Sequence, residues 1–215
     1  MNTISNRIKE VAKLIAPFRK IADIGCDHGY LICEALDNDY CDFALGIDNK
    51  IGPITSAKNN LASYDKSKYD LLLSNGIDDL PDDIECILIL GMGGILITEI
   101  LSNFNKLQNV KRIILQPNKN SFEVRKFMTS NGYKITNEKI IFDNKKYYEI
   151  IVFEKGFENY SSIELKYGPI NLKEKTPTFK DYITSRIVRL KNVAEEKEIK
   201  DKIKEMEEIL WLLKM

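Results

Sequence analysis

The segment Ile21–Leu31 (Ile-Ala-Asp-Ile-Gly-Cys-Asp-His-Gly-Tyr-Leu) constrains the fold of this chain more than any other stretch. It starts with a short apolar run, turns through Gly25 and Gly29, and then enters a helical pattern. Glycine permits a sharp backbone turn and a close approach to a ligand. The segment therefore predicts a strand, a glycine turn and a helix, the opening unit of a nucleotide-cofactor fold.

Short apolar runs alternate with amphipathic helical patterns along most of the chain. A leading helix is expected over residues 4–16, with Ser5 as its N-cap and Pro17 at its end. Such alternation indicates βαβ units around a parallel sheet. The expected strands are 21–24, 43–47, 69–73, 86–90 and 112–115, and the expected helices between them are 30–36, 54–63, 95–104 and 122–130.

The pattern changes after Gly132. Two strand-like runs, 133–142 and 147–153, flank the turn sequence Asp-Asn-Lys-Lys at 143–146. They predict a β-hairpin that brings one antiparallel strand into the sheet. A mostly parallel seven-stranded sheet with a terminal hairpin is typical of Rossmann-like class I methyltransferases.

The C-terminal part predicts helices. Residues 156–178 contain Gly168-Pro169 and Pro177 and are expected to form a linker. Two apolar stripes at helical spacing follow and predict an α-helical hairpin, a coiled coil of two antiparallel helices. We therefore divide the chain into a methyltransferase domain with its N-terminal helix, 1–156, and a linker with a helical hairpin, 157–215.

The charge balance gives no sign of a nucleic-acid partner by itself. The chain has 32 Lys and Arg against 32 Asp and Glu, whereas nucleic-acid-binding proteins usually carry a basic excess. Positive charge gathers locally at 180–191 and at the turn 144–146, although clusters of this size are more often solvated surface. No membrane span or signal peptide is evident, so a cytoplasmic protein is expected. One histidine and four cysteines without a Cys-x-x-Cys pair predict no metal site.

Asp27 discriminates between cofactors. A helix N-terminus after a glycine loop holds pyrophosphate in dinucleotide enzymes, and a carboxylate beside that anion is unfavourable. The ammonium and sulfonium groups of S-adenosylmethionine accept such a carboxylate. The sequence therefore favours S-adenosylmethionine over NAD. The loop residues expected to bind it are Asp23, Gly25, Cys26, Asp27, His28 and Gly29.

Further candidates follow the next two strands. Asp48, with Asn49, stands where a carboxylate can accept hydrogen bonds from both ribose hydroxyls, or where it caps a helix. Asn75, with Gly76, follows the third strand, where an amide can meet adenine or simply form a turn. We expect all four residues to bind the cofactor.

The fourth and fifth strands end where a substrate would face the cofactor. Gly91-Met92-Gly93-Gly94 follows the fourth strand, and we expect Gly91 and Met92 to contact the cofactor. Gln116-Pro117-Asn118 follows the fifth strand, and its two amides could hold a base edge or form a strand-to-helix turn.

Together these segments resemble the TrmK family of bacterial tRNA (adenine-N1)-methyltransferases, which modify adenine 22 in the D-arm. The resemblance covers essentially the whole chain, although Asn75 stands where an aspartate is expected and the C-terminal hairpin looks shorter than in many relatives. Outside the strand ends it rests on Ser5-x-Arg7, Gly52-Pro53 with Ala57, Tyr147-Tyr148-Glu149 and Tyr167-Gly168-Pro169.

The resemblance implies methyl transfer from S-adenosylmethionine to N1 of adenine 22. Asp27 would be catalytic, by stabilising the cationic product and accepting a proton, while Gln116 and Asn118 orient the base. Met92, Tyr30 and Phe122 would line a pocket for the flipped base. The part 157–215 would bind tRNA, and a monomer is expected. The substrate contacts implied are Arg7, Tyr30, Gly93, Gly94, Pro117, Lys180, Arg186 and Arg189.

Two alternatives stay open at this point. The first is a methyltransferase of the same fold that acts on another RNA, a protein or a small molecule. The second is a catalytically silent RNA-binding scaffold, against which the intact Asp23, Asp27 and Asp48 argue.

Overall fold

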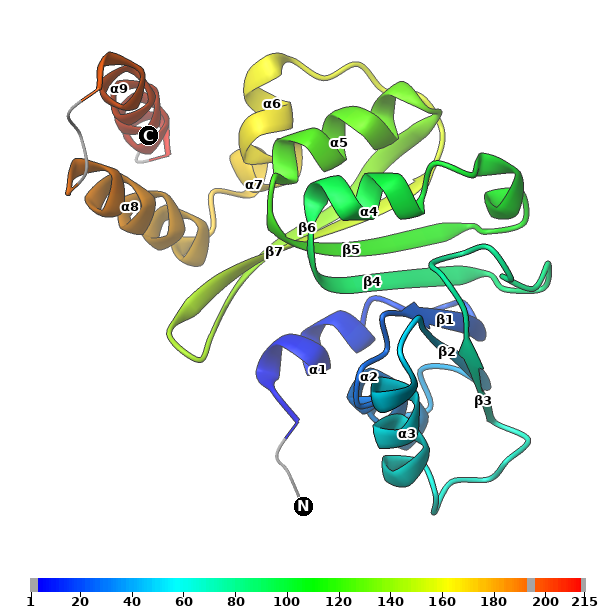
Figure 1. The fold of residues 1–215 in the computed structure, drawn as a ribbon. Coiled ribbons are helices and arrows are strands. Elements are labelled where there is room, and N and C mark those ends of the chain that lie inside the picture. The colour runs from blue at the N-terminus through cyan, green and yellow to red at the C-terminus, as the bar shows by residue number, and fades with distance from the viewer. Residues whose placement is uncertain (1–3, 193–195, 214–215) are drawn as a thin grey trace.

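The computed structural model describes residues 4–192 and 196–213. Its centre is a seven-stranded sheet in the order β3-β2-β1-β4-β5-β7-β6 (Figure 1). Only β7 runs in the direction opposite to the other strands of this sheet, as the predicted hairpin requires. The strands are β1 Lys20–Ile24, β2 Phe43–Asp48, β3 Tyr69–Leu73, β4 Cys86–Gly93, β5 Arg112–Lys119, β6 Tyr133–Asp143 and β7 Lys146–Lys155.

Helices cover both faces of the sheet (Figure 1). Alternate side chains of the central strands enter two separate cores: in β4, Leu88 packs toward one face and Ile89 toward the other. Strands buried on both faces are apolar throughout, as expected for a parallel sheet. One face carries α1 Asn6–Ala12, α2 Tyr30–Asp37 and α3 Ile51–Asn60, and the other carries α4 Gly94–Ile100, the short 3-10 helix η1 Phe104–Leu107 and α5 Ser121–Ser130.

The predicted linker is wrong in part, because residues 162–174 form two short helices, α6 Ser162–Tyr167 and α7 Pro169–Glu174. Ser161 begins α6 with a capping box: its side chain accepts from the Glu164 backbone N–H, and Glu164 accepts from the Ser161 N–H at 2.7 Å. Gly168, at φ +90°, separates the two helices, and Pro169 occupies the first turn of α7. The Gly168-Pro169 pair thus ends α6, as a helix breaker should, and also begins α7.

Several boundaries differ from the sequence pattern. Strand β4 extends to Gly93 and β5 to Lys119, which places the glycine run and the Gln116 segment inside the strands. Helix α3 begins at Ile51, three residues earlier than expected, because Pro53 lies in its first turn, where no backbone donor is needed. The hairpin turn is confirmed, with Asn144 and Lys145 both at positive φ, as a type I′ turn requires.

The two C-terminal helices are confirmed as α8 Pro177–Lys191 and α9 Lys197–Leu212. They form a small core of their own, in which Ile183 and Met206 pack with Ile140 of β6 and Tyr167 of α6. The pair lies beside the β6–β7 hairpin, at the upper left of Figure 1. Division of the chain at residue 156 stays a prediction. Among the described residues, no helix has the length and apolar character needed to cross a bilayer.

Candidate active site

Three carboxylates gather where β1 and β2 end. Asp23 is 4% exposed, and its carboxyl lies within electrostatic reach of Asp48, Asp27 and Arg7. Burial, helped by the charges of Asp48 and Asp27 and opposed by Arg7, raises the pKa of Asp23 to about 7. A buried carboxylate beside two others favours a cationic ligand and disfavours an anion such as pyrophosphate. The donor set therefore fits the ammonium and sulfonium groups of S-adenosylmethionine.

The loop after β1 has the backbone that its glycines predict. Gly25 and Gly29 have φ values of +75° and +70°, and Asp27 between them has φ +48°. A Cβ on Gly25 would lie 2.2 Å from Cε of Met92, so Met92 of β4 covers the loop directly. Gly29 packs against Ala57 of α3, where an added Cβ would lie 3.2 Å from the alanine Cβ. The structure thus brings the loop and Met92 together.

Asp27 and its neighbours project from this loop toward solvent. The Asp27 side chain is 69% exposed, and its Oδ1 lies 3.7 Å from Nε2 of His28. The rings of His28 and Tyr30 stack with centroids 5.5 Å apart. Cys26 of the same loop is buried. Asp27 is therefore the accessible carboxylate of the three and Asp23 the buried one.

The ends of β2 and β3 lie beside the loop after β1, at the sheet edge where parallel α/β folds bind ligands; this region, with Asp23, Asp27 and Asp48, is the carboxylate crevice. Asp48 accepts a hydrogen bond from the Lys50 backbone N–H at 3.0 Å, while Lys50 itself holds the N-cap position of α3. Asn49 and Asn75 are exposed, and Gly76 turns at φ +59° against Ile100. Asp48 is thus outside the helix and keeps a second carboxylate oxygen for a ligand.

A hydrogen-bonded chain crosses from α1 to the ends of β4 and β5. The Arg7 guanidinium donates to Oε1 of Gln116. Gln116 is fully buried, and its Nε2 donates to Oδ1 of Asn118 at 3.0 Å. Nδ2 of Asn118 then donates to the carbonyl of Gly91 at 2.5 Å. These hydrogen bonds fix the orientation of both side-chain amides. Gln116 does not face solvent, and its part is to orient Asn118.

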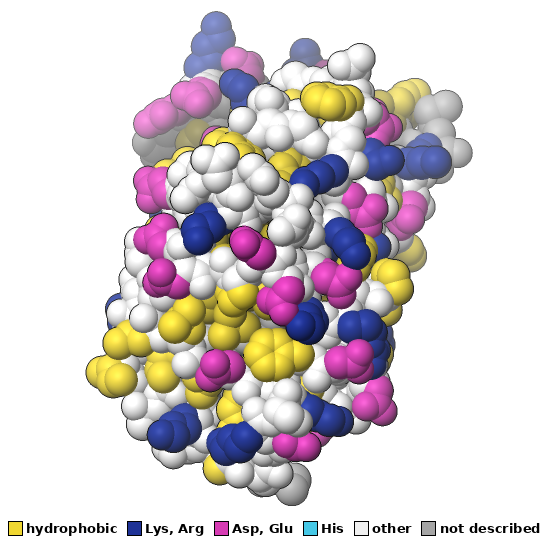
Figure 2. All heavy atoms as spheres, turned by 90° about the vertical axis from the view of Figure 1, so that its right-hand side faces the viewer, with side chains coloured by type: hydrophobic (Ala, Val, Ile, Leu, Met, Phe, Trp, Pro, Cys, Tyr) yellow, Lys and Arg dark blue, Asp and Glu magenta, His cyan; other side chains and the backbone are white. Residues whose placement is uncertain are grey.

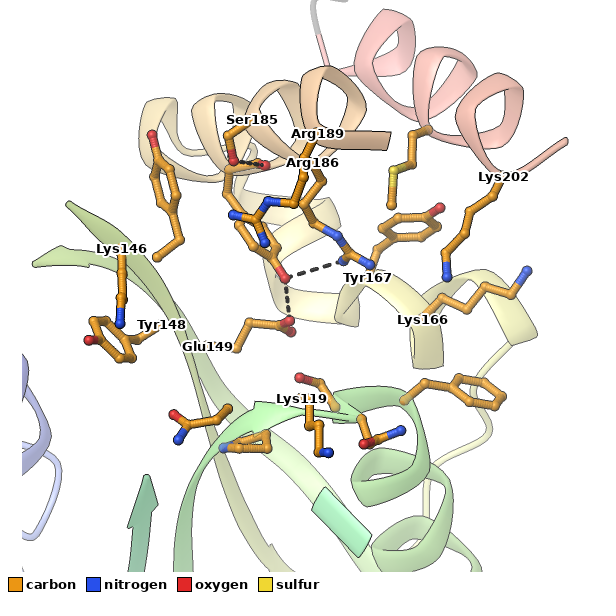
Figure 3. A pocket seen from close by; sticks show the side chains of 18 of the residues that line it. Lys119, Lys146, Tyr148, Glu149, Lys166, Tyr167, Ser185, Arg186, Arg189 and Lys202 are labelled. Atoms are coloured by element: carbon orange, nitrogen blue, oxygen red, sulfur yellow. Dashed lines mark hydrogen bonds between the residues drawn. The ribbon is translucent and has the colours of Figure 1, made fainter. Parts of the chain in front are cut away.

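Beside this chain opens a cleft of about 1310 Å³. The β6–β7 hairpin, the β5–α5 turn, α6, α8 and α9 surround it, and Figure 3 shows basic side chains converging on it from these elements. The Tyr148 ring forms part of one wall and lies 4.9 Å from the Arg7 guanidinium. The basic lining residues are Arg7, Lys119, Lys145, Lys146, Lys166, Arg186, Arg189 and Lys202.

Most of these cations have no carboxylate partner. Lys119, Arg189 and Lys202 make no ion pair with any described residue. Lys166, by contrast, pairs with Glu205 at 2.6 Å. The opposite edge of the molecule differs: Figure 2 shows basic and acidic side chains intermingled there. Where the strands begin, Lys111 pairs with Glu85 at 2.8 Å. The cleft lining also includes the carboxylates Glu123, Glu149, Glu198, Asp201 and Glu205, so the cleft has an excess of positive charge but is not free of negative charge.

The predicted substrate residues divide into two groups. Arg7, Pro117, Arg186 and Arg189 line the cleft, together with Asn118 and Gly91. Gly93 and Gly94 lie at the start of α4, where Gly94 packs on the Asn120 carbonyl; these two, Tyr30 and Lys180 are not part of the cleft lining. Their substrate contacts stay predictions. No group of three or more metal-ligating side chains is close enough, within the described residues, to hold a metal ion.

Sequence reasoning assigned no role to several cleft residues. Lys119, Lys166 and Lys202 come from β5, α6 and α9, so only the fold brings them together. Glu149 could have been singled out from the sequence, because it is a carboxylate within the apolar run 147–153. Such a residue needs a buried partner, which the structure supplies as Arg125 at 2.9 Å.

The sheet order with one antiparallel strand, and a glycine loop whose carboxylates suit a cationic ligand, define a Rossmann-like methyltransferase. The family model described as tRNA (adenine(22)-N(1))-methyltransferase, TrmK, matches residues 21–214. The chain belongs to this family, which confirms both the fold class and the resemblance seen in the sequence.

Individual relatives match over almost their full lengths. The chain is 31% identical over 227 residues to the tRNA (adenine(22)-N(1))-methyltransferase of Bacillus subtilis (strain 168), which covers 98% of this chain and 95% of that protein. A Streptococcus pneumoniae structure solved with S-adenosyl-L-methionine matches with a TM-score of 0.92 at 33% identity, over 97% of this chain and 100% of that one. M. capricolum TrmK, solved with S-adenosyl-homocysteine, has a TM-score of 0.87 at 25% identity, over 98% and 99%.

Proposed function

We propose that this chain transfers the methyl group of S-adenosylmethionine to N1 of adenine 22 in tRNA. Membership of the family supports the reaction. The observation that carries it is the position of Arg7, which lines the cleft and also acts electrostatically on Asp23. The carboxylate crevice and the basic cleft therefore adjoin, as transfer from a cationic donor to an RNA base requires.

The crevice holds the cofactor through complementary charge. Bound S-adenosylmethionine supplies an electrophilic methyl group on a sulfonium. Asp23, ionised when a cation approaches, faces the positive part of the molecule, while Asp48 accepts from the ribose hydroxyls with its remaining oxygen. Gly25 keeps the first loop free of a side chain next to Met92.

The cleft presents the base. N1 of neutral adenine has an in-plane lone pair, so alignment rather than deprotonation starts the reaction. N1 lies on the pairing edge, and the base must leave its stack before it reacts. Tyr148, with Arg7 against its ring, offers a flat wall for the exposed base. Asn118, already oriented by Gln116 and Gly91, retains a second N–H and a second lone pair for the base edge.

Asp27 stabilises the product charge. Methylation of N1 makes the adenine ring cationic and acidifies its exocyclic amino group. The exposed Asp27 carboxylate, on the loop beside the crevice, stabilises that charge and accepts the proton. The unpaired cations of the cleft contact tRNA phosphates, which position the RNA without reading its sequence. We further propose that the enzyme acts in the cytoplasm as a monomer.

Transfer of a tritium-labelled methyl group tests this function. Unmodified tRNA should accept label, and the same tRNA with guanine at position 22 should not. Label on protein or ribosomal RNA, with none on tRNA, would favour a same-fold methyltransferase of another specificity. Absence of S-adenosylmethionine binding in calorimetry would favour a silent scaffold. Either result would overturn the proposal.

A further inference from the structure

A buried charge cluster borders the cleft through Glu149 and includes none of the carboxylates at the ends of β1 and β2. The Arg125 side chain of α5 is 0% exposed; it pairs with Glu138 of β6 at 2.7 Å and with Glu149 of β7 at 2.9 Å. Glu138 is also 0% exposed, and the Glu149 side chain is 11% exposed. Two carboxylates share one guanidinium, so Arg125 compensates the charge of Glu149 only in part.

A tyrosine of α8 forms a hydrogen bond with this carboxylate. The Tyr182 hydroxyl donates to Oε1 of Glu149 at 2.5 Å. Burial alone would raise the pKa of Glu149, but Arg125, Tyr182 and Arg186 outweigh it, and the pKa lies below its ordinary value. Glu149 is therefore ionised and can only accept. The Tyr182 hydrogen is committed to it, and the Tyr182 oxygen is left to accept from elsewhere.

Arg186 supplies that donor. Its NH1 donates to the Tyr182 oxygen at 3.2 Å, and its guanidinium lies 5.3 Å from the centroid of the Tyr182 ring. No carboxylate among the described residues forms an ion pair with Arg186. Figure 3 shows the guanidinium pointing from α8 into the cleft, with dashed bonds to the tyrosine and on to Glu149.

We propose that Tyr182, fixed by Glu149, is a positioning residue that holds Arg186 for a tRNA phosphate. This inference rests on the proposed function. Arginine has five N–H donors in a fixed fork, and a single bond to Tyr182 leaves the others for phosphate oxygens. A side chain held in place before binding loses less conformational entropy when the RNA arrives. The tie also anchors α8 to β7, so the cleft keeps its width.

The test uses substitutions that separate charge from position. Tyr182→Phe keeps the net charge and the ring but removes the hydroxyl. We expect the KM for unmodified tRNA to rise about fivefold to tenfold, with kcat and the KM for S-adenosylmethionine near wild type. Arg186→Ala should raise the tRNA KM by a similar factor and reduce the salt slope of tRNA binding by about 1. The double variant should match Arg186→Ala alone, because both changes remove the same contact.

A second variant avoids the buried cluster. Arg186→Lys keeps the positive charge but loses the fork, so it should impair tRNA binding nearly as much as Arg186→Ala. Tyr160→Phe is the matched control: its hydroxyl also joins a carboxylate, Glu158 at 2.7 Å, but lies outside the cleft lining. It should leave the tRNA KM unchanged. Stoichiometric binding of S-adenosylmethionine verifies that each variant is folded.

Three results would overturn the inference: a wild-type tRNA KM in Tyr182→Phe, full activity in Arg186→Lys, or effects that multiply in the double variant. If wild-type enzyme methylates tRNA and one of these results appears, only the positioning role is lost. If wild-type enzyme does not methylate tRNA, the proposed function itself fails.

Discussion

Met92 of β4 lies so close to Gly25 of the first loop that a Cβ on Gly25 would approach Met92 Cε to 2.2 Å. Gly25 directly follows β1, which pairs with β4 in the register Asp23↔Leu88 and Ile24↔Ile89. The contact places the end of the Met92 side chain against the turn that follows β1.

Gly25→Ala should impair cofactor binding more than folding. The flexible end of Met92 can swing away, but φ of +75° disfavours any residue with a Cβ by about 1–2 kcal/mol. We expect that loss in the free energy of unfolding and at least a tenfold weaker affinity for S-adenosylmethionine, measured by denaturation and calorimetry.

Gly52→Ala is the control for this substitution. Gly52 lies in α3, and a Cβ there would meet nothing within 4 Å. Alanine is a better helix former, so this variant should be as stable as wild type or more stable, with unchanged cofactor affinity. Normal cofactor affinity in Gly25→Ala would remove the loop from the binding site.

Cofactor affinity should depend on pH through Asp23. The pKa of its carboxyl is about 7, and a cationic ligand binds the ionised form, so a proton must leave before binding at lower pH. Affinity therefore rises with pH until the pKa is passed, and the Kd at pH 6 should be about tenfold weaker than at pH 8. In Asp23→Asn this dependence should disappear. Calorimetry over this pH range measures the cofactor Kd of both proteins. An unchanged pH dependence of the Kd in Asp23→Asn would exclude Asp23 as the titrating group.

Asp27→Ala should reduce turnover more than binding. A positioned acid or base contributes about a hundredfold or more to rate, so kcat should fall by at least that factor while the cofactor Kd changes little. Asp39→Ala is the matched control, because Asp39 is also exposed and also has positive φ, at +54°. Single-turnover methylation assays compare the two. Equal rates would remove Asp27 from the mechanism.

The unpaired cations of the cleft should dominate tRNA affinity. Arg189→Ala removes a lining charge that has no carboxylate partner among the described residues, and should reduce the salt slope of tRNA binding by about 1. Lys58→Ala removes an exposed charge on α3, away from the cleft, and should leave the slope unchanged. Filter binding over a range of salt concentrations gives both slopes. The same slope in both variants would place the RNA elsewhere.

Most of the strands and helices could be predicted from the local spacing of apolar residues and from the turn sequences. The apolar run at 69–73 and the turn at 143–146 lie where periodicity and turn chemistry place them. The segment 162–174 was missed because Gly168-Pro169 indicates a break, although Ser161 and Glu164 have the spacing of a capping box. The error arose because two local patterns in this segment indicate different structures: the Gly-Pro pair indicates a break, and the capping box indicates the start of a helix.

The cleft could not be predicted in the same way. The strand-end residues Asp23 and Asp48 are predictable as neighbours, because parallel strands end at a common edge. Lys119 and Lys202 approach one cleft only through the packing of α8 and α9 on Ile140 and Tyr167, which no local pattern encodes.

Mapping of the methylated nucleotide tests the central claim most directly. Unmodified tRNA is treated with enzyme and S-adenosylmethionine, digested, and analysed by mass spectrometry, with primer extension to show whether the pairing edge is blocked. We expect one added methyl group, on N1 of adenine 22. A methyl group at another nucleotide, on an atom outside the pairing edge, or on no nucleotide at all would contradict the account.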